Sequence, residues 1–305
     1  MSENYRIECI PNISSTDPVL LRLISKGIEA VSGVVLHFVD PGHSANRTVF
    51  TYTGPVKEVF QATRILFKLT LSHVDMRKHT GVHPRMGAVD VCPFVLLDDP
   101  HFAKDFKNRT IIFASQIAQE FKVALYGYEG LARNVRQKDL SYIRHGQYEG
   151  LRERLIRGEL PDFGPVTYNS SVEQYGATAI GIRPLMVAYN VNLSGLPAAQ
   201  LLPIAKKIAG LIRERDGGLQ GVKSIGWHLP DRDIVQVSCN LTKPDIVGVC
   251  DVFLRVAELA QEFNCDAPSS ELIGCIPKSQ FTTLTAEQLG FGEFKPFGAH
   301  RILPF

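Results

Sequence analysis

The pattern of apolar and polar residues along the first half of the chain distinguishes predicted strands from predicted helices. Short, largely apolar segments predict strands at residues 5–13, 34–39, 48–53, 88–97 and 123–128. A spacing of three or four residues predicts amphipathic helices at residues 17–31, 56–72 and 109–121. Asp17 is placed to cap the first of these helices, with Pro18 in its first turn. The first six elements follow the order β-α-β-β-α-β, which is the ferredoxin-like pattern.

The second half repeats this order. Strands are predicted at residues 178–193, 222–229, 234–241 and 271–276, and helices at residues 197–214 and 245–263. Residues 133–165 are charged and contain Gly and Pro, and we interpret them as a helical linker. In the last stretch, from residue 279 on, Thr285 is placed to cap a short helix at residues 286–289, and the G-F-G-E-F-K-P-F-G run at residues 290–298 resembles a loop. We therefore expect an α/β (α+β) protein with two ferredoxin-like βαββαβ subdomains, at residues 1–178 with the linker and at residues 179–305.

Length and charge narrow the class of protein. A chain of 305 residues with a formal net charge of +2 has room for one large domain or two medium ones. Near-neutrality, without a polybasic run, gives no reason to expect nucleic acid or an anionic membrane as a partner. The opening M-S-E-N-Y-R lacks the apolar stretch of a signal peptide, and no apolar run reaches the ~20 residues of a membrane helix. We therefore expect a soluble cytoplasmic protein.

The cysteines and glycines do not indicate a cofactor. Six cysteines are spread along the chain without a C-x-x-C pair, so a zinc site is not indicated and buried reduced thiols are expected. The segments G-A-T-A-I-G and D-G-G-L-Q-G lack the spacing and the lysine of a P-loop, and no dinucleotide-binding fingerprint follows the first strand. The sequence thus predicts neither a metal nor a nucleotide cofactor.

Candidate chemistry gathers in H-T-G-V-H-P-R-M-G-A-V-D-V-C-P-F, residues 79–94, where a loop precedes a predicted strand. Pro84 pushes His83 into an extended conformation, and Gly87 allows a tight turn or a close approach to a ligand. An imidazole on a stiffened loop suits general acid–base catalysis, although a lone histidine is more often structural. His79 lies four residues before His83, but the loop between them is not a helix, which disfavours a metal site.

Eight segments, spread over nearly the whole chain, match one family in the same order. They are E-C-I-P-N (8–12), D-P-G-H-S-A-N-R-T-V (40–49), H-P-R-M-G-A-V-D-V-C-P-F (83–94), D-F-G-P (162–165), G-A-T-A-I-G-I-R (176–183), V-A-Y-N-V-N-L (187–193), V-K-S-I-G-W (222–227) and Q-V-S-C-N-L-T (236–242). With these segments the chain resembles the formiminotransferase domain, the folate-dependent glutamate formimidoyltransferase. The resemblance implies two similar α/β subdomains with a ligand groove between them, and a homodimer. It also implies transfer of a formimino group from N-formimino-L-glutamate to N5 of the co-substrate tetrahydrofolate.

The resemblance also assigns roles to residues. His83 would take the proton from N5 and later protonate the departing glutamate amine. Asp40 would lie near the reacting centre, where it orients the imidazole or stabilises the amidinium. Because both substrates are anionic, Arg47 and Arg85 are implied as carboxylate-binding groups, followed by Arg183. The implied substrate- and folate-binding set is completed by Gly87, His43 and Asn46.

Several interpretations stay open at this point. Asp90 either faces the ligand or forms a structural salt bridge, and Trp227 either stacks on a pterin or fills the core. The chain has N-I-S-S-T-D-P at residues 12–18, where family members usually have N-F-S-E-G, so substrate preference can differ. The sequence ends where the bifunctional animal enzyme continues into a cyclodeaminase domain, so that second activity is not expected. Two alternative functions are a related folate enzyme using a formyl donor such as 5-formyltetrahydrofolate, and a folate-binding protein without turnover.

Overall fold

The structure is a computed structural model that describes residues 5–230, 232–293 and 296–303. The chain divides into two compact units, Met1–Arg183 and Pro184–Phe305. Each unit has its own sheet and its own hydrophobic core, and the architecture is mixed α/β. The expected boundary lies slightly earlier, inside the last strand of the first unit. The groove expected between the halves stays a prediction.

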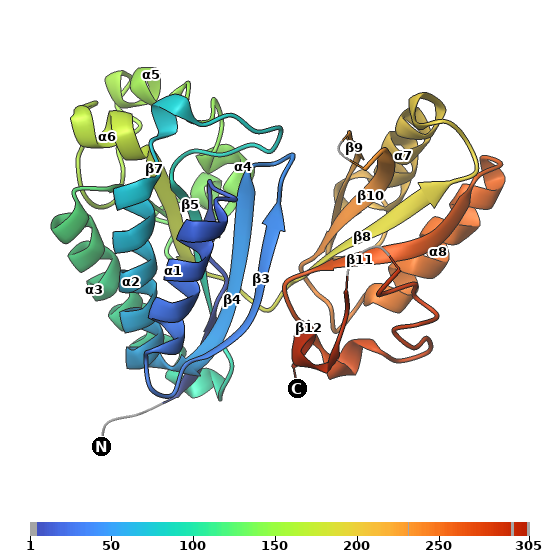
Figure 1. Cartoon of the computed structure of the whole chain (residues 1–305), viewed down its shortest axis with the longest axis horizontal. Coiled ribbons are helices and arrows are strands. Elements are labelled where there is room, and N and C mark those ends of the chain that lie inside the picture. Colours follow the sequence, from blue (N-terminus) through green and yellow to red (C-terminus); the bar gives the residue numbers. More distant parts are fainter. Residues whose placement is uncertain (1–4, 231, 294–295, 304–305) are drawn as a thin grey trace. The chain divides into compact units, whose positions relative to one another are not determined.

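A seven-stranded mixed sheet forms the centre of the first unit (Figure 1). Its strands are β1 (Arg6–Cys9), β2 (Asn12–Ile13), β3 (Val35–Gly42), β4 (Arg47–Pro55), β5 (Val89–Leu96), β6 (Ala124–Glu129) and β7 (Ala177–Ile182). β3 pairs with β4, β4 pairs with β1 and β2, and these pair with β5, which is followed by β7 and β6. β7 is parallel to both of its neighbours, and the other pairs are antiparallel. The predicted strands are confirmed, except that residues 5–13 form two strands, because Pro11 has no N–H for the ladder.

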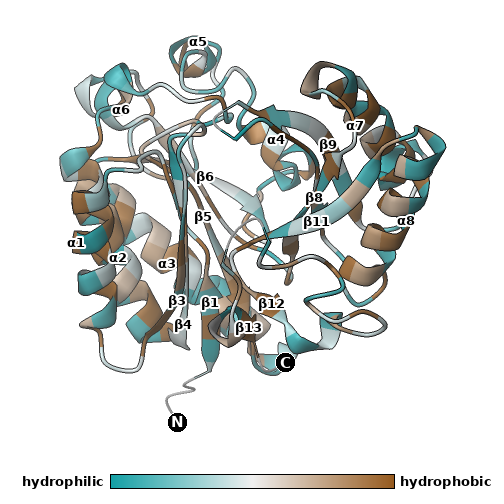
Figure 2. Cartoon of the chain, turned by 45° about the vertical axis from the view of Figure 1, so that its right-hand side comes forward, coloured by the Kyte–Doolittle hydropathy of each residue, from teal (hydrophilic) through white to brown (hydrophobic). Residues whose placement is uncertain are grey.

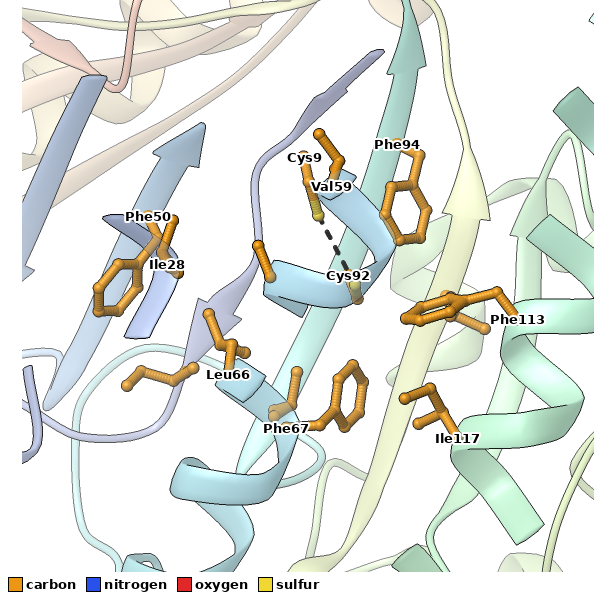
Figure 3. Close-up of a cluster of buried hydrophobic side chains, with 14 of the residues drawn as sticks. Cys9, Ile28, Phe50, Val59, Leu66, Phe67, Cys92, Phe94, Phe113 and Ile117 are labelled. Carbon is orange, nitrogen blue, oxygen red and sulfur yellow. Dashed lines mark hydrogen bonds between the residues drawn. The ribbon is translucent and has the colours of Figure 1, made fainter. Parts of the chain in front are cut away.

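Three helices cover one face of this sheet. They are α1 (Pro18–Glu29), α2 (Val56–His73) and α3 (Ala103–Phe121). Asp17 caps α1 as predicted, because its side chain accepts the Val19 N–H at 2.9 Å. Apolar and polar segments alternate along α1, as expected of an amphipathic helix (Figure 2). The apolar faces of the helices pack on β1, β4 and β5 in a core that includes Phe94, Phe113 and the thiol of Cys9 (Figure 3).

The segment between β6 and β7 is less helical than the sequence predicted. It forms turns with α4 (Leu140–Ile143), α5 (Leu151–Ile156) and α6 (Ser170–Tyr175). Gly146 and Gly158 have φ angles of 72° and 83°, in the left-handed region where helices end. The segment packs on the other face of β6 and β7, where it encloses a small core around Met86 and Tyr126.

The single strand predicted at residues 178–193 is wrong. The chain forms β7 in the first sheet and β8 (Val187–Ser194) in the second sheet. Pro184 lies between them, has no N–H to donate and restricts the residue before it, so the strand cannot continue. The apolar pattern missed this break because both strands are apolar.

The second unit contains a four-stranded antiparallel sheet in the order β11-β8-β10-β9. Its other elements are β9 (Val222–Leu229), β10 (Ile234–Leu241), β11 (Asp266–Ile273), α7 (Ala198–Ile212) and α8 (Val249–Glu262). The predicted hairpin of β9 and β10 is confirmed. Both helices contribute to one core with the sheet, which includes Val191, Ile208 and Val256.

Short elements complete the two units. They are β12 (Ile276–Pro277), which pairs in parallel with β13 (Ile302–Leu303), and the 3-10 helices η1 (Met76–Lys78), η2 (Pro100–Phe102), η3 (Val135–Lys138), η4 (Glu214–Asp216), η5 (Lys278–Gln280) and η6 (Ala299–Arg301). β12 begins at the end of the strand predicted at residues 271–276, and β13 follows the run at residues 290–298 for which the sequence suggested a loop. Within the described part of the chain, no helix combines the length and the apolarity needed to cross a membrane.

Strand alternation sets which side chains of the first sheet point away from α1, α2 and α3. Ile7 and Cys9 lie in the helix-covered core, so Glu8 between them points to the opposite face. In β4, Phe50 lies in the same core, and Arg47, three residues earlier, points to the opposite face. We call this second side of the sheet, which carries Glu8 and Arg47, the polar face.

Candidate active site

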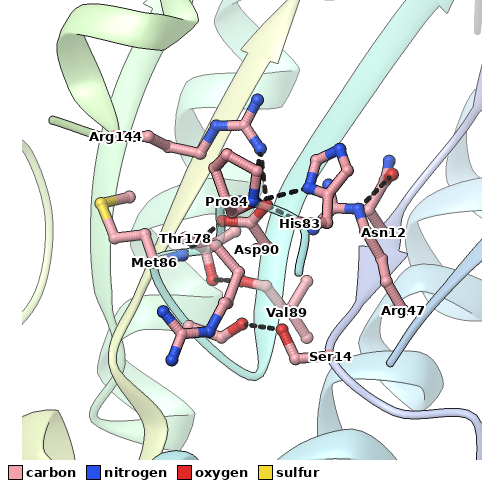
Figure 4. A network of polar contacts seen from close by, with 12 residues as sticks. Asn12, Ser14, Arg47, His83, Pro84, Met86, Val89, Asp90, Arg144 and Thr178 are labelled. Atoms are coloured by element: carbon pink, nitrogen blue, oxygen red, sulfur yellow. Dashed lines mark hydrogen bonds and ion pairs between the residues drawn. The ribbon is translucent and has the colours of Figure 1, made fainter. Parts of the chain in front are cut away.

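A buried carboxylate organises the polar residues at the start of β5 (Figure 4). Asp90 is 0% exposed, and its Oδ2 accepts hydrogen bonds from Arg47 at 2.5 Å and from Arg144 at 3.0 Å. Its Oδ1 accepts the Met86 N–H at 2.7 Å. Arg47 also donates from Nε to Asn12 Oδ1 at 3.2 Å. Of the two interpretations that the sequence left open for Asp90, the structure shows the ion pair.

The fold brings these groups together from distant parts of the first unit. Arg47 is the first residue of β4, Asp90 is the second residue of β5, and Arg144 directly follows α4. The register of β2 on β5 shifts beside Asp90. Such a bulge re-aims a side chain, and here it accompanies the contact between Asp90 and Arg47.

Opposing electrostatic effects act on this network. Burial raises the pKa of Asp90, but the attraction of Arg47 and Arg144, with the Met86 N–H, outweighs burial and holds that pKa below its usual value. Burial lowers the pKa of Arg47, and the attraction of Asp90 opposes this. Two cations and one anion leave a net positive charge, so the network favours an anion in its vicinity.

His83 lies on the loop before β5, next to this network, and is partly exposed. Its Nδ1 donates a hydrogen bond to the carbonyl oxygen of Pro84 at 2.7 Å. The neutral ring therefore carries its proton on Nδ1, and Nε2 is the basic nitrogen. Burial, followed by repulsion from Arg47 and Arg144, lowers the pKa of His83 to about 3. The imidazole is thus neutral at pH 7 and can accept a proton at Nε2.

Two loops are joined beside His83. Nε2 of His79 donates to the carbonyl oxygen of Asn46 at 2.9 Å, and Nδ2 of Asn46 donates to the carbonyl oxygen of Thr80 at 2.9 Å. Asn46 has a φ of 44°, in the left-handed region that asparagine enters more readily than most residues. The predicted ligand-binding residue Asn46 therefore holds the loop that carries His83.

Arg85 is buried and has partners inside the protein. Its guanidinium donates to both carboxylate oxygens of Glu149 at 2.8 and 2.6 Å, and its Nε donates to His79 Nδ1 at 3.2 Å. The hydrogen bonds to Glu149 raise the pKa of Arg85. Both ring nitrogens of His79 thus contact protein atoms. Binding of a substrate carboxylate by Arg85 stays a prediction, because that contact would have to replace Glu149.

Gly87 has no room for a side chain. A Cβ atom there would lie 2.3 Å from the carbonyl oxygen of Ala177 and 2.7 Å from that of Tyr175. Ser14 Oγ donates to the carbonyl oxygen of Gly87 at 2.7 Å. In the structure Gly87 closely approaches the chain entering β7, and the close approach to a ligand that the sequence suggested stays a prediction.

The other predicted residues lie at different distances from the network. Asp40 in β3 is buried and lies, by strand register, in the same row across the sheet as Asn12. His43 is exposed on the turn between β3 and β4. Arg183 lies just beyond β7, roughly 16 Å along the strands from the level of Asp90 at ~3.3 Å per residue. Arg183 is therefore not part of the network around Asp90.

Two charged residues of this region were not predicted from the sequence. Arg144 lies 54 residues after Asp90, and Glu149 lies 64 residues after Arg85. Both belong to the segment between β6 and β7, outside the matching blocks, so only the fold reveals them. Asn12 stands in the E-C-I-P-N block, but nothing in the local pattern links it to Arg47. Among the described residues, no group of three or more His, Cys, Asp or Glu side chains is placed to hold a metal ion.

Solved structures offer only distant likenesses. The periplasmic protease PqqL from Escherichia coli aligns over 86% of this chain and 34% of its own length, at 11% identity and a TM-score of 0.20. A likeness this low does not bear on fold or function.

Protein families and sequence relatives give a clear result. Residues 6–183 match the N-terminal subdomain of the formiminotransferase domain, and residues 188–289 match the formiminotransferase domain. Formimidoyltransferase-cyclodeaminase from Dictyostelium discoideum is 38% identical over 281 residues, covering 90% of this chain and 51% of that protein. The chain thus spans about half the length of these bifunctional relatives. Glutamate formimidoyltransferase from Streptococcus pyogenes serotype M1 is 34% identical over 274 residues, covering 89% of both chains. The chain belongs to the formiminotransferase domain family.

Proposed function

We propose that this protein is a transferase that moves the formimino group from N-formimino-L-glutamate to N5 of tetrahydrofolate, giving 5-formiminotetrahydrofolate and glutamate. The observation that carries the proposal is the neutral imidazole of His83, with its proton directed to the Pro84 carbonyl oxygen, next to the Arg47–Arg144 pair. The family match supports it, as do relatives of similar length named glutamate formimidoyltransferase.

The reaction needs a base for the N5 proton and an acid for the departing amine, and one imidazole can serve as both in turn. As N5 attacks the formimino carbon, Nε2 of His83 takes the N5 proton and a tetrahedral adduct forms. The imidazolium then protonates the glutamate amine as its bond to carbon breaks. The lowered pKa makes this imidazolium a strong acid for the second step. An anionic substrate near Arg47 and Arg144 offsets their repulsion and so raises the pKa of His83 for the first step.

The charged groups around His83 bind and orient the substrates in this proposal. Arg47 and Arg144 attract the carboxylates of formiminoglutamate, with Arg85 as a further candidate once Glu149 is displaced. Asp40 stabilises the positive charge of the amidinium. The second group of proposed ligand contacts is Gly87, His43, Asn46 and Arg183.

We propose that both units have the ferredoxin-like fold. In the second unit, β8-α7-β9-β10-α8-β11 gives the strand order β11-β8-β10-β9. In the first unit, β1-α1-β3-β4-α2-β5 gives the equivalent order β5-β1-β4-β3, which β7 and β6 extend. The division into residues 1–178 and 179–305, the homodimer and the cytoplasmic location stay predictions.

A turnover assay with a donor panel tests the proposed reaction. Wild type, His83→Ala and His73→Ala are each incubated with tetrahydrofolate and N-formimino-L-glutamate, and released glutamate is measured. His73 is a matched control because its Nδ1 also contacts a carbonyl oxygen, that of Leu69 at 2.8 Å, on the exposed end of α2. We expect release by wild type and His73→Ala, and a loss of about 10²–10⁴-fold in His83→Ala.

Other donors separate the alternative functions in the same assay. Turnover of 5-formyltetrahydrofolate without turnover of N-formimino-L-glutamate would replace formimino transfer by formyl transfer. Tetrahydrofolate binding without turnover of either donor would make the protein a folate-binding protein.

A further inference from the structure

A second set of polar residues lies on the polar face, away from His83. Glu8 in β1 is 4% exposed, and no described residue forms a hydrogen bond to its carboxyl group. Burial raises the pKa of Glu8 to about 7, and the attraction of Arg183 only partly opposes this. A buried carboxyl group without hydrogen bonds is costly for a folded protein, and such groups are concentrated at functional sites.

Strand register places Glu8 in a row across three strands. Glu8 pairs with Thr53 in β4 on one side and with Val95 in β5 on the other side. Beyond β5, the N–H of Arg183 donates to the carbonyl oxygen of Phe94 at 3.0 Å, so Arg183 lies at the level of Val95. Glu8 in β1 and Arg183, directly after β7, thus lie on the two sides of β5.

The row of Glu8 and the row near His83 share one face of the sheet. Val95 pairs with Glu8, and Val91, four residues earlier in β5, pairs with Asn12, which contacts Arg47. At ~3.3 Å per residue the two rows are roughly 13 Å apart. A small group such as the formimino carbon cannot touch both rows. A fused two-ring heterocycle, with side chains reaching it from both rows, can.

We propose that the carboxyl group of Glu8 binds the amidine-like edge of the pterin ring of tetrahydrofolate. This inference rests on the formimino transfer proposed above, because it assigns the orientation of that co-substrate. The pterin presents two adjacent N–H groups, from N3 and the 2-amino group, and two carboxylate oxygens accept such a pair in parallel. The pterin edge then supplies the hydrogen bonds that Glu8 does not have in this structure.

The formimino group is also an amidine, but it is not the occupant of this row. It must lie within reach of His83 during transfer, whereas the Glu8 row is about four residues away along β5. The glutamate tail of the folate is excluded by its negative charge. With the pterin edge at Glu8, N5 on the opposite side of the ring system points toward His83.

Binding measurements that vary both the protein and the ligand test the proposal. Tetrahydrofolate and its 2-desamino analogue are titrated calorimetrically into wild type, Glu8→Gln and Glu58→Gln. Glu58 is a matched control because its Oε2 is buried and has no hydrogen-bond partner among the described residues, but it lies in the first turn of α2. We expect Glu8→Gln to weaken tetrahydrofolate binding about 10- to 100-fold, which is the worth of a lost pair of charge-assisted hydrogen bonds.

Two further results are expected if Glu8 contacts the 2-amino group directly. Wild type binds the 2-desamino analogue about 10- to 100-fold more weakly than tetrahydrofolate, and Glu8→Gln loses nothing more with that analogue. The KM of Glu8→Gln for N-formimino-L-glutamate stays within about twofold of wild type, while its KM for tetrahydrofolate rises. Glu58→Gln matches wild type throughout. If Glu8→Gln does not fold, Glu8→Asp withdraws the same charge by one methylene group and serves in its place.

The outcomes distinguish this proposal from the proposed function. Unchanged tetrahydrofolate binding by Glu8→Gln overturns the role of Glu8, and glutamate release by wild type would then still support formimino transfer. Equal losses for tetrahydrofolate and the 2-desamino analogue also overturn it, because Glu8 would act elsewhere. The expected losses in Glu8→Gln, without glutamate release by wild type, support the pterin contact and overturn formimino transfer.

Discussion

Replacing Glu8 by glutamine should make the folded protein more stable above neutral pH. Burial raises the pKa of Glu8 from 4.5 to about 7 in the folded protein. The folded state therefore holds this proton more tightly than the unfolded state does. The free energy of unfolding falls as the pH rises from about 4.5 through about 7, and it changes little above that range. Glutamine stays neutral, so the variant does not lose this free energy of unfolding as the pH rises.

The magnitude follows from the size of this shift. A change from 4.5 to about 7 corresponds to about 3 kcal/mol at ~1.4 kcal/mol per pKa unit. Glu8 is 4% exposed, so solvent screening reduces this little. The stability difference between Glu8→Gln and wild type should therefore grow by about 3 kcal/mol between pH 4 and pH 8.

Urea unfolding at a series of pH values measures this difference. Glu58→Gln is the control, because it makes the same substitution in the first turn of α2, outside the polar face. A stability difference for Glu8→Gln that does not change between pH 4 and pH 8 would refute the reasoning. Glu8 would then ionise normally in the folded protein. A stabilised variant that has also lost tetrahydrofolate affinity would indicate that the buried carboxyl group is kept for binding.

Three further substitutions test the contacts around His83. Asp90→Asn removes the counter-charge of the buried Arg47 and the half-buried Arg144. It should lower the free energy of unfolding by about 3–5 kcal/mol in urea titrations, whereas an unchanged midpoint would contradict the buried ion pair. Arg144→Gln removes one of the cations that lower the pKa of His83, so the midpoint of its ring signals in NMR titrations should rise, and a fall would be inconsistent with repulsion. Gly87→Ala places a Cβ atom 2.3 Å from the Ala177 carbonyl oxygen. The overpacking should cost roughly 1–3 kcal/mol and lower the melting temperature by several degrees, and an unchanged melting temperature would contradict the tight contact.

Apolar patterns predicted most elements because the helices have one apolar face and the central strands are buried on both faces. The α1 cap at Asp17 and the β9–β10 hairpin depend on local residues, and both are confirmed. The assignment of β7 to the first sheet depends on its parallel pairing with β5 and β6, which no local pattern encodes. The sequence therefore predicted one continuous strand where the structure has two apolar strands, β7 and β8, separated by a proline.

The candidate site likewise contains residues that the sequence pointed to and residues that only the fold brings together. The matching blocks pointed to His83 and Arg47, which share one neighbourhood in the structure. They could not show that Asp90 bridges Arg47 and Arg144, because Arg144 belongs to a separate segment. The sequence placed Glu8 in a matching block but gave no signal of its burial, which depends on the surrounding fold.

Chemical rescue of His83→Ala tests the central claim most directly. Glutamate release from N-formimino-L-glutamate in the presence of tetrahydrofolate is measured as free imidazole is added to this variant and to wild type. The account predicts a slow variant whose rate rises in proportion to imidazole concentration, while wild type does not respond, because only the proton-transfer group is missing. A His83→Ala variant that releases glutamate at the wild-type rate without imidazole would contradict the account.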